Sequence, residues 1–242
     1  MIQNFIIPNH LQERYADVYT PEVLIALADL FRFNQEIKEL MQKRINKRTN
    51  RQQLGERISF LDSSSFIPRT DIKVQDARDG KFEGSIIPAD LQRQWIQGTG
   101  PAAKPNASLE SSIRNVAYAL LSGADGWMFD GEDALGQINT MSLDNQRNLK
   151  LAIAKDPVFL QVAEKVAEEM NNWSIGFLGR KIVVDWAQQL NFTTRIFRAR
   201  GLHLDDRHIT DIHGKSIAAS IVDLALYVVN NYQALLQAGS SI

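Results

Sequence analysis

The chain has 242 residues, 44% of them apolar, and its 27 basic and 28 acidic residues leave a formal net charge of −1. A chain of this length can bury a sizeable core, and its balanced charge gives no reason to expect a nucleic-acid partner. The absence of cysteine excludes disulfides and thiolate-bound metals. The N-terminus, MIQNFIIPNH, lacks the basic start and long apolar core of a secretory signal, and charged residues interrupt the longest apolar runs. We therefore expect a cytoplasmic protein without a membrane span.

The first segment is predicted to be helical. Thr20 followed by Pro21 is a favourable helix start, with a capping hydroxyl before a proline at the first helical position. Apolar residues then recur at helical spacing from Val23 onward. The basic run Lys43–Arg51 (KRINKRTNR) is open to two interpretations, a phosphate-contacting patch or a hydrated helix end. The second is favoured, because cations suit the C-terminal end of a helix dipole.

Helices and strands are predicted to alternate further along the chain. Leu109–Leu121 has helical periodicity and leads into Trp127–Phe129, a short apolar run typical of a buried parallel strand. A second capped helix is expected to start at Asp156. Lys181–Trp186 (KIVVDW) and Thr193–Phe197 (TTRIF) both have the composition of strands.

Three acidic residues directly follow the predicted strand 127–129: Asp130, Glu132 and Asp133. The carboxyl end of a parallel strand is where barrel and open-sheet enzymes place their chemistry. Clustered carboxylates there repel one another unless a cation or a proton offsets the charge. The alternative is a surface turn in which the acids are simply hydrated. The strand 193–197 ends in the same way at Arg198, with the opposite charge.

Several segments, taken in order, resemble the malate synthases, in particular the shorter isoform typical of bacteria and plants. Ile87–Pro101 (IPADLQRQWIQGTGP) is similar to the segment that opens their barrel, and Asp130–Asp133 (DGED) is similar to their D-x-E-D strand end. Gly136-Gln137 and Asn145–Leu149 match the next family segment more loosely.

The last two similar segments lie near the C-terminal end. Arg198–Leu204 (RARGLHL) resembles the family's R-P-R-G-W-H-L, with Ala199 in place of proline and Leu202 in place of tryptophan, and Gly214–Gln237 resembles the helix that follows the second barrel strand. Gly131 is a further departure, because the family usually has an aromatic residue before the glutamate.

The resemblance implies an α/β fold in two parts. Residues 1–80 would form an N-terminal helical clasp, and residues 81–242 would form the first part of a (β/α)8 TIM-type barrel that is incomplete in this chain. A barrel typically needs about 250 residues of its own. The two strand ends of opposite charge, at Asp130 and Arg198, would then face each other across the barrel mouth.

The activity implied by the resemblance is that of an acyltransferase of the glyoxylate cycle, which joins acetyl-CoA and glyoxylate by a Claisen condensation to give malate. The enolate oxygen needs a fixed positive group, and glyoxylate suits a divalent cation such as Mg²⁺ with oxygen ligands. The resemblance assigns the catalytic arginine to Arg198, with Arg200 as the alternative, and places Asp130 and Glu132 in the same site. Glu132 and Asp133 would contact Mg²⁺ weakly, through water. The alternative role for Arg198 is a structural ion pair with a barrel carboxylate.

In the family, the two metal-binding acids and the catalytic base lie further along the chain, so no residue here is assigned those roles. We therefore expect this chain alone to be inactive, and a C-terminal portion or a partner chain to complete the barrel and the Mg²⁺ site. Two other hypotheses stay open. One is a related lyase that cleaves a malyl-CoA or citramalyl-CoA substrate, and the other is a shortened, non-catalytic relative that acts in assembly or regulation.

Residues 203–213 (HLDDRHITDIH) gather histidines and aspartates in one short stretch. Their spacing does not match a zinc-binding pattern, so a polar loop with capping residues is the favoured interpretation.

Overall fold

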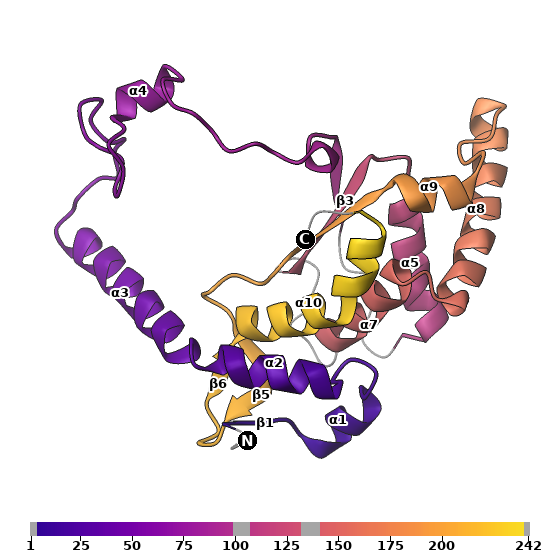
Figure 1. Ribbon diagram of the computed structural model, residues 1–242, viewed down its shortest axis with the longest axis horizontal. Coiled ribbons are helices and arrows are strands. Elements are labelled where there is room, and N and C mark those ends of the chain that lie inside the picture. Colours follow the sequence, from indigo (N-terminus) through magenta and orange to yellow (C-terminus); the bar gives the residue numbers. More distant parts are fainter. Residues whose placement is uncertain (1–3, 99–106, 132–140, 240–242) are drawn as a thin grey trace.

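The computed structural model describes residues 4–98, 107–131 and 141–239, and within them the chain has a mixed α/β fold (Figure 1). In chain order the elements are β1 (Phe5–Ile6), α1 (Asn9–Arg14), α2 (Pro21–Phe31), α3 (Asn34–Gln53), α4 (Val74–Arg78), the 3-10 turn η1 (Ala89–Leu91), β2 (Trp95–Gly98), α5 (Leu109–Leu121), β3 (Gly126–Asp130), α7 (Met141–Ile153), α8 (Pro157–Leu178), α9 (Trp186–Phe192), β4 (Thr194–Arg198), β5 (Asp205–Asp211), β6 (Ser216–Ala218) and α10 (Ala219–Gln237).

The helix starts predicted from local sequence are confirmed. The Thr20 hydroxyl accepts a hydrogen bond from the Val23 amide at 3.4 Å, and α2 begins at Pro21. The Asp156 carboxylate accepts one from the Val158 amide at 2.9 Å at the start of α8. Each of these side chains satisfies a backbone N–H that has no partner within the first turn.

Strands β2, β3 and β4 form a parallel sheet in which spatial order follows chain order. Gly126 pairs with Trp95 on one side and with Thr194 on the other, and Asp130 pairs with Arg198. Helix α5 lies against β3, and α7 and α8 pack on α5 (Figure 1). Trp127 is 1% exposed in the core that these elements share. In the described residues this sheet has three strands and does not close into a barrel.

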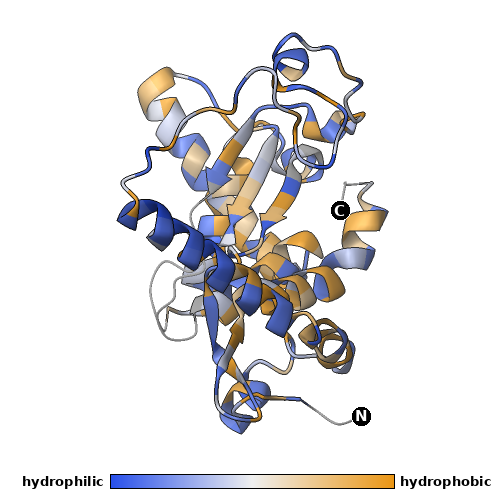
Figure 2. Ribbon diagram, turned by 90° about the vertical axis from the view of Figure 1, so that its left-hand side faces the viewer, coloured by the Kyte–Doolittle hydropathy of each residue, from blue (hydrophilic) through white to orange (hydrophobic). Residues whose placement is uncertain are grey.

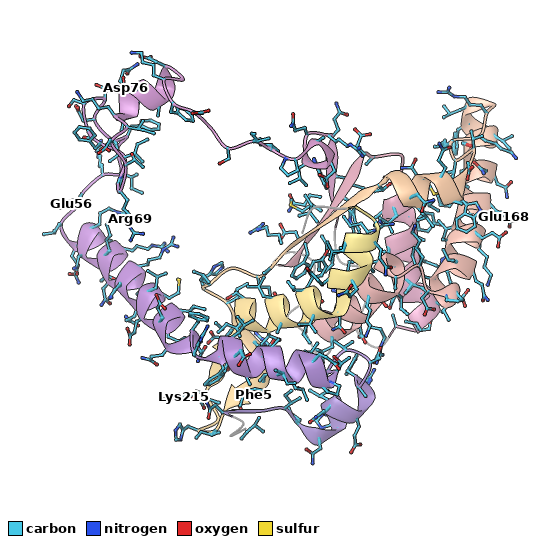
Figure 3. The ribbon with its side chains drawn as sticks, in the orientation of Figure 1. Phe5, Glu56, Arg69, Asp76, Glu168 and Lys215 are labelled. Carbon is cyan, nitrogen blue, oxygen red and sulfur yellow. The ribbon has the colours of Figure 1, made fainter. Side chains whose placement is uncertain are left out.

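A second hydrophobic cluster joins the two ends of the chain. Strand β1 pairs antiparallel with β5, which pairs with β6, and helix α2 packs against α10. Fully buried side chains such as Val23 and Ile209 fill the space between them. Figure 3 labels Phe5 and Lys215 at this antiparallel sheet. The N-terminal helices and α10 therefore share one core, whereas the division of the chain at residue 80 stays a prediction.

Helix α3 projects from the body of the molecule toward α4 (Figure 1), and none of its residues is buried. Figure 2 shows it as almost entirely hydrophilic. The basic side chains from Lys43 to Arg48 are exposed in its second half, which agrees with the favoured interpretation of a hydrated helix end. Glu56 and Asp76 lie beyond it in the projecting part of the chain (Figure 3).

The prediction of a strand at Lys181–Trp186 is wrong, because Trp186 begins α9 and residues 181–185 before it form an irregular connection. Side chains of α8 hold its backbone instead of a neighbouring strand. The Ile182 amide donates to the Ser174 hydroxyl at 3.0 Å, and the Val183 amide donates to the Asn171 side-chain oxygen at 3.0 Å. Val183 is buried against the core, which explains the apolar composition without a strand.

The prediction of a polar loop at 203–213 is also wrong, because residues 205–211 form β5, the central strand of the antiparallel sheet. Asp206 is only 2% exposed and faces inward, where it contacts Arg200. A charged residue at a buried position interrupts the alternation of apolar and polar residues by which a strand is recognised in sequence. Within the described residues no histidine, aspartate and glutamate side chains form a group of three that could hold a metal ion.

Gly126 is predicted to be intolerant of a side chain, because the Trp95 indole lies against it. A Cβ atom at residue 126 would lie 2.3 Å from the nearest indole carbon, so the ring would have to move away. We expect Gly126→Ala to lower the free energy of unfolding by about 1–3 kcal/mol, measured by denaturant titration.

The matched control is Gly176→Ala in the exposed part of α8, where a Cβ atom meets nothing within 4 Å. Alanine is the better helix former, so this variant should gain about 0.5–1 kcal/mol. A loss of stability at residue 176 similar to that at residue 126 would contradict the steric explanation.

Candidate functional site

The ends of the three parallel strands bring together three polar side chains: Gln97 from β2, Asp130 from β3 and Arg198 from β4. Asp130 Oδ2 accepts hydrogen bonds from Gln97 Nε2 and from Arg198 Nη1, each at 2.5 Å. Asp130 and Arg198 lie at the same end of the sheet, as expected, but they lie side by side on adjacent strands instead of facing each other across a barrel mouth. This follows from the parallel register, which pairs residue 130 with residue 198.

The Asp130 carboxylate is buried and therefore needs polar partners within the protein. The Asp130 side chain is 0% exposed, and an isolated carboxylate in such a place would lose several kcal/mol of hydration. The Arg198 guanidinium and the Gln97 amide replace that hydration with a charge and a hydrogen bond. The Arg198 side chain is 50% exposed, so the pair presents a cation at the accessible edge while the anion is enclosed.

Gln97 is the residue of this group that sequence reasoning did not identify. It is the third residue of a four-residue strand, so its side chain lies on the same face as Trp95 and opposite to Ile96. A polar residue at this point of an otherwise apolar strand is a signal that it faces a site. That signal becomes specific only once β2 is known to lie next to β3.

Arg200, the alternative to Arg198, lies in a different environment. Its side chain is 3% exposed, and its Nη2 atom lies 2.7 Å from Asp223 Oδ1 and 2.8 Å from Asp206 Oδ2. Its Nε atom and its backbone amide also donate to Asp223. The guanidinium is thus enclosed by two buried carboxylates, and the geometry favours Arg198 as the arginine of the strand-end site.

The charges of this buried group affect one another. Burial lowers the pKa of Arg200, but its hydrogen bonds to Asp223 and the charges of Asp223 and Asp206 outweigh burial and raise the pKa above its usual value. Burial raises the pKa of Asp223, and Arg200 opposes that rise. Because three donors of Arg200 converge on Asp223, we assign an ionised pair at neutral pH.

Glu132 and Asp133, the predicted water-mediated contacts of Mg²⁺, lie outside the described residues. Among the described residues, no group of three potential ligands is present, and the Asp130 Oδ2 atom is already bound by Gln97 and Arg198. The described part of the chain therefore does not by itself fit a magnesium site.

A cavity of ≈ 340 Å³ lies at the other end of the sheet, where the chain enters β3 and α9. Its lining includes Leu121, Gly123 and Val183. Catalytic groups of barrel enzymes lie at the carboxyl ends of the strands, so this cavity is not the candidate site.

Comparison with known proteins places the chain in context. Residues 194–242, which begin at β4 and include Arg198, match the family described as malate synthase, TIM barrel domain. Malate synthase A of Escherichia coli (strain K12) is 32% identical over 175 residues, or 72% of this chain. Malate synthase of Myxococcus xanthus (strain DK1622) is 29% identical over 93% of the chain, and glyoxysomal malate synthase of Gossypium hirsutum is 26% identical over 95%.

The chain is similar to the malate synthases. The similarity extends from the N-terminal helices to α10, because the alignments with the Myxococcus and Gossypium proteins cover nearly the whole chain. The chain spans about a third of the length of these relatives, namely 27% of the Escherichia protein, 35% of the Myxococcus protein and 34% of the Gossypium protein.

No helix in the described part of the chain combines the length and the apolar character needed to cross a membrane.

Proposed function

We propose that this chain forms the first part of a malate synthase barrel, in an enzyme that condenses acetyl-CoA with glyoxylate to malate. The observation that supports this most strongly is the Asp130–Arg198 pair at the carboxyl end of adjacent parallel strands. In a (β/α)8 barrel that edge forms the active-site mouth. We further propose that β2, β3 and β4 are its first three strands and that further strands complete it.

The proposed reaction has three steps. A base removes a proton from the acetyl methyl group. The resulting enolate carbon attacks the aldehyde carbon of glyoxylate, and the aldehyde oxygen takes up a proton to become the hydroxyl group. Water then cleaves the thioester to release CoA and malate. We assign Arg198 to the charge that develops on the enolate oxygen or on the α-oxo acid. Its guanidinium is planar and permanently charged, and half of the side chain is accessible.

Asp130 and Gln97 would act on Arg198 rather than on substrate. A buried carboxylate that holds one guanidinium nitrogen limits the rotamers available to the arginine, and Gln97 in turn fixes the carboxylate. Such preorganisation lowers the reorganisation needed when charge develops. We propose the base and the principal Mg²⁺ ligands outside the described residues, with Glu132 and Asp133 contacting the ion through water.

The cellular location stays a prediction. The sequence led us to expect a cytoplasmic protein, whereas relatives from Gossypium hirsutum, Brassica napus and Zea mays are named as glyoxysomal. Fractionation of the native cells would determine the location.

The activity can be tested on two preparations, the protein purified from its own cells with any chain that accompanies it, and the isolated 242-residue chain. Release of free CoA from acetyl-CoA is measured with and without glyoxylate, in the presence of Mg²⁺ and again after addition of EDTA. We expect glyoxylate-dependent, EDTA-sensitive release from the native preparation, and a rate at least about a hundredfold lower from the isolated chain.

The other hypotheses give different results in the same assay. Cleavage of malyl-CoA or citramalyl-CoA without condensation would identify a lyase and overturn the proposal. Absence of both activities from the native preparation would identify a non-catalytic relative. Full activity of the isolated chain would show that the base and the metal ligands lie within these 242 residues.

A further inference from the structure

The chain on both sides of Arg198 is attached to helix α10. The Phe197 ring stacks on the Tyr227 ring, with centroids 4.3 Å apart and an angle of 19° between the planes. Two residues after Arg198, the Arg200 amide donates to Asp223 Oδ2 at 2.8 Å. Because residues 223 and 227 are four apart in a helix, they lie on one face, and the end of β4 rests on that face.

The Arg198 side chain itself points away from α10. Successive side chains of a strand alternate between its two faces. Phe197 faces α10 and the core, and its ring also stacks on Phe129 at 5.5 Å. Arg198 lies on the opposite face, where its guanidinium reaches Asp130. Helix α10 can therefore influence Arg198 only through the backbone of β4 and of the residues that follow.

Two buried aspartates bind Arg200, and they differ in what else they hold. Asp223 of α10 binds both the backbone amide and the side chain of Arg200. Asp206 contacts the side chain of Arg200 but not its backbone, through Oδ2. Its Oδ1 atom accepts hydrogen bonds from the His208 and Ile209 amides within β5. Asp223 thus joins the end of β4 to α10, whereas Asp206 serves β5.

We propose that α10 positions Arg198 against Asp130, with Asp223 and Tyr227 as the positioning residues. The two contacts fix the backbone on either side of residue 198, so that the guanidinium is presented at the strand-end site in one orientation. The catalytic importance of this orientation rests on the proposed function, but the positioning itself is a property of the fold.

A double-mutant cycle on the isolated chain tests the positioning without any assay of activity. The unfolding equilibrium is measured by denaturant titration for Asp130→Asn, for Arg198→Gln and for the double variant. The cycle is repeated in the Asp223→Asn background and, as a matched control, in the Asp206→Asn background. Both background changes remove one buried carboxylate charge from Arg200, but only the first weakens the link to α10.

In the wild-type background we expect a coupling between residues 130 and 198 of about tenfold in the unfolding equilibrium constant. The coupling should fall below about threefold with Asp223→Asn and stay near tenfold with Asp206→Asn. Equal coupling in all three backgrounds would overturn the proposal, because Asp223 would then contribute only to general stability.

A second pair of variants covers the case in which Asp223→Asn does not fold. Tyr227→Leu removes the ring that stacks on Phe197 and leaves the charges of Arg200 and Asp223 unchanged, whereas Tyr227→Phe keeps the ring. The coupling should fall in the leucine variant and persist in the phenylalanine variant. Equal coupling in these two variants would overturn the role of Tyr227. Lost coupling in a protein without malate synthase activity would support the positioning and refute only the proposed function.

Discussion

Arg198→Lys is expected to lower the kcat of the complete enzyme by about two to three orders of magnitude, the effect of losing one preorganised donor to a developing oxyanion. Lysine keeps the positive charge, but its single mobile ammonium replaces the planar guanidinium of arginine. In the unmodified protein Asp130 holds one nitrogen of that guanidinium. The KM for glyoxylate should change by less than about threefold, because the lost interaction forms mainly in the transition state. Steady-state kinetics with both substrates separates the two effects.

Arg207→Lys is the matched control, since Arg207 is an exposed residue of the nearby strand β5. Its kcat and KM should equal those of the unmodified enzyme. If kcat is unchanged in Arg198→Lys as well, Arg198 is the structural arginine of the strand end, and the catalytic role would pass to Arg200 despite its burial.

Arg200→Met is expected to be the most destabilising of the proposed single substitutions, at about 3–5 kcal/mol. Methionine has a similar volume, but it leaves Asp206 and Asp223 buried side by side without a cation. Burial raises the pKa of Asp223, and in the variant Arg200 no longer opposes that rise. The deficit is therefore smallest at acid pH, where Asp223 is protonated in both the folded and the unfolded chain, and it grows as the pH rises through the folded-state pKa of Asp223. Denaturant titrations at pH 4 and pH 7 would measure it.

Arg195→Met provides a sharp control, because Arg195 is another buried arginine of the same region, only 5% exposed. Its Nη2 atom donates to the Leu190 carbonyl, its Nε atom has no hydrogen-bond partner in the part of the chain that the structure describes, and burial lowers its pKa. Among the described residues it has no carboxylate partner, so methionine should be neutral or stabilising there. Equal losses at residues 195 and 200 would show that packing, rather than charge compensation, determines the effect.

The features predicted correctly from the sequence depend on neighbours in the chain or on a single general rule. The capped starts of α2 and α8 need only Thr20 and Asp156 with the residues that follow. The meeting of Asp130 and Arg198 needs only two parallel strands that end at the same edge.

The features that were missed depend on side-chain contacts between different elements of the fold. Lys181–Trp186 has the composition of a strand, but two of its backbone amides donate hydrogen bonds to the side chains of Ser174 and Asn171 instead of to a neighbouring strand. Gln97 can be assigned to the site only from its hydrogen bond to Asp130. The buried Asp206 is compatible with strand β5 because the Arg200 guanidinium binds its carboxylate. Such contacts have no local pattern, so a single sequence does not reveal them.

The pairing of β1 with β5 and the packing of α2 on α10 have a consequence for how the protein is made. Ribosomes add about 5–20 residues per second, so the N-terminal helices leave the ribosome about 10–40 s before α10 does. During that interval the apolar side chains of α2, such as Val23 and Leu27, have no partner from the C-terminal side. The parallel strands follow chain order and can pair as each one emerges. Helix α2 is therefore synthesised long before the partner that buries it, and nascent chains should depend on chaperones that shield it.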